Sequence, residues 1–235
     1  MTSTRTGFLA ELDRLQQMLL EMGAAVDGLI AQAMRALEKP DASTVETVLA
    51  GDDVVDNLDI EIEKHCLYLI ALQQPTARDL RFIGSAMKIS TDLERIADHA
   101  VDVAKVARKL IALGYSPEVT PLGELVSIIR RMLADALNAF VMHDLDLLAK
   151  VIADDDEVDA RYLDFTTRTT ASMEETTDNV VASSYLLFVV HYLERVADHI
   201  VNIAERVTYV ETGDVARYVH APGSMPAGGT SPLEE

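Results

Sequence analysis

The stretch Leu93–His99 reads LERIADH, and one hundred residues later Leu193–His199 reads LERVADH. A second pair of stretches precedes them, because Asp52–Asp56 reads DDVVD and Asp155–Asp159 reads DDEVD. Two matches in the same order along the chain are hard to obtain by chance. We therefore predict that the chain contains an internal repeat.

Apolar residues recur at helical spacing almost throughout the chain, which predicts an all-α fold. Trp is absent and only 5% of the residues are aromatic, so the core must be aliphatic. Helix formers are abundant, and Gly and Pro are sparse before the C-terminal stretch. The pattern predicts six long helices, at about Thr4–Leu37, Ala42–Leu72, Ala77–Leu113, Val119–Met142, Leu145–Glu175 and Asn179–Val210.

The clearest internal break is Gly114–Pro117, which divides the six helices into two groups of three. We therefore predict two tandem three-helix bundles, at residues 1–114 and 119–212. The composition changes after Thr212, where Gly and Pro become frequent. Residues 213–235 are predicted to form a disordered tail.

The formal net charge of −19 makes nucleic acid an unfavourable partner, because the chain repels phosphate backbones. Cations and basic protein surfaces are the natural partners of such a chain. Cys66 is the single cysteine, so no internal disulfide is possible. We find no signal peptide and no apolar run near the ~18 residues that span a bilayer. These features predict a cytoplasmic protein that meets membranes only through its partners.

Carboxylates four residues apart lie on one face of a helix, and such pairs recur at repeat-related places. On the third helix of each half the row continues by one more turn, to Asp102 in the first and Asn202 in the second. The pairs are Asp52 with Asp56, Glu94 with Asp98, Asp155 with Asp159, and Glu194 with Asp198.

Two interpretations of these pairs stay open. Like charges at this spacing destabilise a helix by roughly 0.2–0.5 kcal/mol per pair, and a cation bound between helices would offset the repulsion. Alternatively, the pairs are solvated and are neutralised by Arg95, Arg195 or a neighbouring lysine. We interpret His99 and His199 as structural or exposed rather than as ligands. The repeated motifs lack the Glu-x-x-His pair of di-iron bundles, which argues against a ferritin-like oxidase.

A third feature is the polar stretch Gln74–Arg81, QPTARDLR, at a predicted helix start. In one interpretation Asp79 favours the helix N-terminus and the two arginines are simply exposed. In the other interpretation Arg78, Asp79 and Arg81 form a contact patch for a partner protein.

Taken together, the tandem LER-x-ADH motifs, the DDVVD and DDEVD stretches and ALQQPTARDLR resemble the PhoU family of phosphate-specific transport system accessory proteins. The resemblance spans about Phe8 to Val210. It implies two similar three-helix bundles, commonly assembled as a homodimer. It also implies a cytoplasmic negative regulator of the phosphate starvation response, which acts between the phosphate ABC transporter ATPase and the sensor histidine kinase of the phosphate two-component system.

The resemblance further implies that iron, zinc or another divalent metal binds in carboxylate clusters. Asn202 fits the family's third-helix motif, whereas Asp102 departs from it and adds charge to the first half. The second half also lacks a clear copy of QPTARDLR, so a partner that docks there would meet the first half only. Carried over to this chain, the candidate ligands are Asp52, Asp56, Glu94, Asp98 and Asp102 in the first half, and Asp155, Asp159, Glu194, Asp198 and Asn202 in the second.

We therefore expect a non-enzymatic adaptor. The alternative is a metal-storage or metal-dependent protein that uses its carboxylate clusters for chemistry. No nucleophile or general base stands out beyond the carboxylates, and no phosphate-binding glycine loop or nucleophile elbow occurs.

Overall fold

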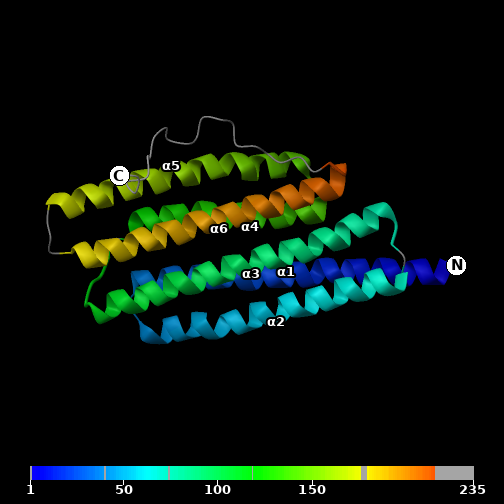
Figure 1. The fold of residues 1–235 in the computed structure, drawn as a ribbon, viewed down its shortest axis with the longest axis horizontal. Coiled ribbons are helices and arrows are strands. Elements are labelled where there is room, and N and C mark those ends of the chain that lie inside the picture. Colours follow the sequence, from blue (N-terminus) through cyan, green and yellow to red (C-terminus); the bar gives the residue numbers. More distant parts are fainter. Residues whose placement is uncertain (1, 40, 74, 118, 176–178, 215–235) are drawn as a thin grey trace, which may run out of the picture.

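The computed structural model describes residues 2–39, 41–73, 75–117, 119–175 and 179–214. Six helices and no strand occur in this part of the chain, which confirms the all-α prediction (Figure 1). Their bounds lie within a few residues of those expected. The helices are α1 (Thr2–Glu38), α2 (Ala42–Gln73), α3 (Ala77–Ala112), α4 (Thr120–Met142), α5 (Leu145–Glu175) and α6 (Val180–Thr212).

Polar side chains and glycine residues determine where several of these helices begin and end. The carboxylate of Asp41 accepts the N–H groups of Ser43 and Thr44 at 3.1 and 3.2 Å, which caps α2. The side-chain hydrogen bond from Ser43 is the main reason that the pKa of Asp41 falls to about 2. At the other end of the chain Gly213, with φ 78°, closes α6 in the left-handed conformation.

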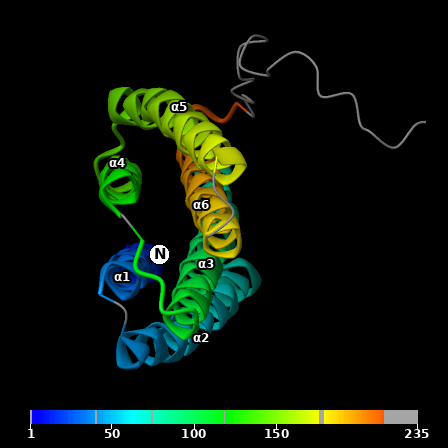
Figure 2. The same ribbon diagram turned by 90° about the vertical axis from the view of Figure 1, so that its left-hand side faces the viewer.

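The helices run along the long axis of the molecule as two stacked bundles (Figure 1). Helix α1 packs on α2 and α3, and α5 packs on α4 and α6. The halves meet through α3 against α6, the most extensive contact between any two helices, and through α1 against α4. Viewed end-on, α5, α6, α3 and α2 form a curved layer, and α4 and α1 lie on its inner side (Figure 2).

Helices α3 and α6 run antiparallel (Figure 1), so repeat-related residues come together between them. The rings of His99 and His199 have centroids 5.7 Å apart. His99 also stacks on Tyr192 at 5.8 Å, and His199 Nδ1 lies 2.9 Å from Asp92 Oδ1. Residues 92 and 192 are themselves repeat-related. An approximate two-fold axis therefore relates the two bundles, as the internal repeat predicts.

The boundaries at 1–114 and 119–212 stay a prediction. The structure places the turn between halves at Gly114, whose φ of 65° suits glycine. The predicted tail lies outside the described residues from 215 onward.

By length and composition alone, α6 could cross a membrane, although no single apolar run reaches that length. In the structure α6 packs against α3, α4 and α5, and residues buried along its whole length join the aliphatic core. A core helix of a helical bundle shows the same features.

The contact of α1 with α4 depends on Gly23. A Cβ at this position would overlap Leu137 Cδ1 of α4, so the two helix backbones lie close together here. Gly28, five residues further along α1, faces open space, because a Cβ there would meet no neighbouring atom within 4 Å.

We expect Gly28→Ala to raise the free energy of unfolding by about 1 kcal/mol, because alanine is the better helix residue. Gly23→Ala gains the same propensity but must displace Leu137, so it should be less stable than Gly28→Ala. Urea unfolding of the two variants provides the comparison. Equal stabilisation by both would contradict the close α1–α4 packing.

Candidate functional site

In the first half, the acidic motifs of α2 and α3 face each other. The pKa of Asp52 is raised by burial and then by repulsion from Asp56 on its own helix and Asp98 on α3. The pKa of Glu94 is raised by burial and by Asp98, with a further contribution from Asp56 across the interface, while Arg95 opposes the shift. The structure thus brings together the two motifs that are far apart in the sequence.

The second half repeats this arrangement between α5 and α6. Burial raises the pKa of Glu194 to about 7, and repulsion from Asp198, Asp159 and Asp155 adds to the effect, while Arg195 opposes it. Asp155 is itself buried, with 4% of its surface exposed. Glu194 Oε2 is buried and has no hydrogen-bond partner. This cluster is therefore the more strongly desolvated of the two.

Cations adjacent in the sequence neutralise part of each cluster. Arg95 Nη1 lies 2.9 Å from Asp98 Oδ2, and its repeat partner Arg195 lies 2.6 Å from Asp198 Oδ2. The second interpretation of the acidic pairs is therefore realised in part. The carboxylate of Glu194 is neutralised less than that of Asp198, because the ring nitrogen near it, His191 Nδ1, lies 3.7 Å away.

The two clusters contain carboxylate donors that suit a divalent metal, but these donors are not arranged around a common point. Within the described residues, no three His, Cys, Asp or Glu side chains converge closely enough to hold an ion as they stand. The donor set nevertheless fits a divalent cation, because it consists of partly desolvated carboxylates that repel one another. The buried oxygen of Glu194 is the clearest single donor. Side-chain rotation, including release of Asp98 and Asp198 from their arginines, would be required.

Asp102 and Asn202, the last members of the predicted rows, lie toward the junction of the halves. Asp102 pairs with Lys105 at 2.9 Å and acts on the pKa of His99. Asn202 Nδ2 lies 3.5 Å from Asp92 Oδ1 of α3. Neither residue contributes to the pKa shifts of the clusters. Their prediction as metal ligands remains untested, and their contacts favour a structural role.

The histidines of the repeated motifs lie at the junction of the two halves, which agrees with a structural role. The pKa of His99 is lowered by burial and then by His199. Sequence reasoning missed Asp92 and Tyr192, which contact these rings. Both stand directly before a repeated motif, but their different residue types conceal the equivalence.

The contacts of QPTARDLR support its role at a helix start, and the partner-contact interpretation stays a prediction. Asp79 is buried, and its carboxylate accepts hydrogen bonds from the Thr76 hydroxyl at 2.6 Å and from the Thr76 N–H at 3.3 Å. It thereby secures the start of α3. Arg78 is exposed and lies 3.3 Å from Glu211. Arg81 approaches Gly213 near the end of α6.

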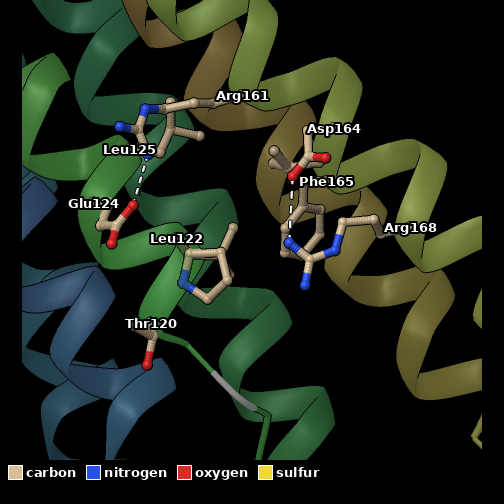
Figure 3. Close-up of a pocket in the computed structure, with 10 residues that line it drawn as sticks. Thr120, Leu122, Glu124, Leu125, Arg161, Asp164, Phe165 and Arg168 are labelled. Atoms are coloured by element: carbon tan, nitrogen blue, oxygen red, sulfur yellow. Dashed lines mark hydrogen bonds and ion pairs between the residues drawn. The ribbon is translucent and has the colours of Figure 1, made fainter.

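A separate cavity of about 220 Å³ lies between α4 and α5 (Figure 3). Its two arginines are already paired, Arg161 with Glu124 at 2.7 Å and Arg168 with Asp164 at 3.4 Å. The cavity therefore offers no uncompensated charge to a ligand.

The fold and the site define a tandem helical-bundle protein with one carboxylate cluster in each repeat. A model of the PhoU domain matches residues 19–107 and again 122–207. The chain belongs to the PhoU family.

Similar proteins cover almost the same length. The phosphate-specific transport system accessory protein PhoU homolog of Clostridium acetobutylicum is 37% identical over 211 residues, which are 89% of this chain and 96% of that protein. The crystal structure of PhoU from Pseudomonas aeruginosa has a TM-score of 0.84 at 34% identity, covering 88% of this chain and 100% of the other. PhoU from Streptococcus pneumoniae has a TM-score of 0.82 at 30% identity, with 89% and 99% covered.

The raised pKa of Glu194 predicts how stability depends on pH in the metal-free protein. Between its ordinary value of 4.5 and about 7, the folded state keeps a proton that the unfolded state releases. The free energy of unfolding should therefore fall as pH rises through this window. Glu194→Gln cannot ionise and should be more stable than the wild type at pH 8 by about 1–2 kcal/mol, with no such gain near pH 5.

Urea unfolding at the two pH values, with a chelator present, measures this difference. Glu205→Gln on the same helix is the control. The same gain at both pH values would show that the carboxyl group of Glu194 is not desolvated.

Proposed function

We propose that the chain is a non-enzymatic negative regulator of the phosphate starvation response. In this role it is an adaptor between the phosphate ABC transporter ATPase and the sensor histidine kinase of the phosphate two-component system. The observation that carries the proposal is the family match to both halves, together with relatives that are named phosphate-specific transport system accessory proteins. The proposal places the protein in the cytoplasm, in contact with the membrane only through these partners.

The architecture supports a function by binding. Six long helices packed on one aliphatic core present extended surfaces that differ between the two halves. The net charge of −19 favours basic surfaces on partner proteins. The proposal includes a homodimer. Exposed apolar side chains of α2 could be buried in its interface. These are Val54, Ile60, Leu67, Tyr68 and Ile70.

We also propose that the carboxylate clusters bind iron, zinc or another divalent metal. In each half the ligands come from two helices, so a bound ion would cross-link them and lower the repulsion between the carboxylates. The buried, unpartnered oxygen of Glu194 favours this proposal. The same observation supports the alternative function, a metal-storage or metal-dependent protein, and the two functions differ in whether regulation needs the metal.

Deletion of the gene, together with any paralogue, should cause constitutive expression of phosphate-starvation genes in phosphate-rich medium. The reason is that nothing would then restrain the histidine kinase. Transcript measurement with and without phosphate provides the test, and a complemented strain is the control. Normal repression after deletion would rule out the regulatory role.

The metal proposal predicts separable sites. Glu194→Gln with Asp198→Asn should remove the metal of the second half and leave that of the first. Glu94→Gln with Asp98→Asn should do the reverse. Elemental analysis of the purified variants, with helicity checked by circular dichroism, measures the outcome. Unchanged metal content in both variants would contradict the assignment of these ligands.

Complementation by a variant that combines all four of these substitutions separates the two functions. The adaptor function predicts that a metal-free variant with intact helices still represses starvation genes. Loss of repression in proportion to lost metal would favour the metal-dependent alternative.

A further inference from the structure

A cavity of about 540 Å³ lies between the start of α3 and the end of α6. Its lining includes the apolar side chain of Leu80, the ring of Tyr209 and the cationic side chains of Arg81, Lys88 and Arg206. No carboxylate belongs to this lining. We call this cavity with its three cations the basic hollow.

The basic hollow is unusual in a chain with 39 acidic and 20 basic residues. Many cations elsewhere pair with carboxylates, as Arg130 does with Asp27 at 2.6 Å. Other cations, such as Arg14 and Lys64, are exposed singly, whereas the hollow gathers three cations around one cavity.

Over the described ranges of the chain, Arg81, Lys88 and Arg206 have no ion pair. The Nε atom of Arg81 is buried without a hydrogen-bond acceptor. Three unpaired cations that line one cavity without a carboxylate indicate a site for an anionic group.

The spacing of the cations indicates the shape of that group. Arg81 and Lys88 are seven residues apart on α3, which places their Cα atoms about 10 Å apart along one helix face. A single small anion would need converging cations, whereas this row suits an extended or helical segment. Leu80 is 47% exposed beside them, so the hollow also presents apolar surface.

Comparison of the two repeats shows that the fold does not require basic residues on this surface. The residues equivalent to Arg81 and Lys88 in the second half are Val181 and Phe188. These two side chains are 58% and 52% exposed. The approximate two-fold axis therefore places an apolar surface of α6 where α3 has the basic one. The two ends of the α3–α6 pair therefore suit different partners.

We propose that the basic hollow docks an acidic segment of a partner protein. Carboxylates of that segment would pair with Arg81, Lys88 and Arg206, and an apolar side chain between them would contact Leu80 and Tyr209. The inference rests on the proposed function, because an adaptor requires partner proteins. It also identifies which part of QPTARDLR is available for contact, since Asp79 is engaged at the helix start.

The test uses a fluorescent helical peptide that carries glutamates seven residues apart with a leucine between them. Fluorescence anisotropy at low ionic strength measures its binding to the full chain, and a peptide with glutamine in place of glutamate should not bind. Lys88→Glu with Arg206→Glu should weaken binding about tenfold or more, because two attractions become repulsions.

The matched control is Arg14→Glu with Lys64→Glu. Both residues are exposed and stand outside the hollow, and this double variant has the same net charge. It should retain wild-type affinity. Equal weakening by both double variants, or no binding to the wild-type chain, would overturn the inference. Displacement of the peptide by inorganic phosphate, but not by chloride at equal ionic strength, would also overturn it and assign the hollow to a small anion.

The peptide assay does not depend on any effect on gene expression. Failure of the docking inference can therefore be distinguished from failure of the regulatory proposal, which the deletion experiment tests.

Discussion

The antiparallel packing of α3 on α6 is the contact on which the rest of the molecule depends. It brings repeat-related residues together at the approximate two-fold axis, where the rings of His99 and His199 meet. Each of these central helices presents its buried apolar face to the core and its acidic motif to one outer helix. Helix α2 therefore faces the motif of α3, and α5 faces that of α6, so a single arrangement produces two carboxylate clusters.

The distribution of charge follows from this arrangement. Carboxylates that the chain could have exposed are instead partly desolvated against one another, and the pKa values of Asp52, Glu94 and Glu194 are raised in consequence. Neighbouring arginines relieve only part of the repulsion. At the same time, three cations at one end of the α3–α6 pair have no carboxylate beside them. The acidic clusters and the basic hollow are thus separate parts of the molecular surface, with opposite charge.

The internal repeat, the six helices and the shared face of each acidic pair could be predicted, because each depends on spacing along the chain or along one helix. That the pairs of two helices come together depends on tertiary packing. The contact of Asn202 could not be predicted from the row that begins at Glu194. At 3.6 residues per turn, eight residues rotate about 80° round the helix, which turns Asn202 away from α5 and toward Asp92 of α3. The basic hollow could not be predicted either, because Arg81 and Arg206 come from opposite ends of two helices and only tertiary packing joins them.

At pH below about 7 the carboxylate cluster around Glu194 should hold a proton that a bound divalent cation replaces. Calorimetric titration of the metal-free protein with manganese(II), in buffers of different ionisation enthalpy, tests it most directly. We expect binding with release of protons at pH 6.5 and little release at pH 8.5, since the pKa of Glu194 is about 7. Binding without proton release at pH 6.5, or no binding at either pH, would contradict it.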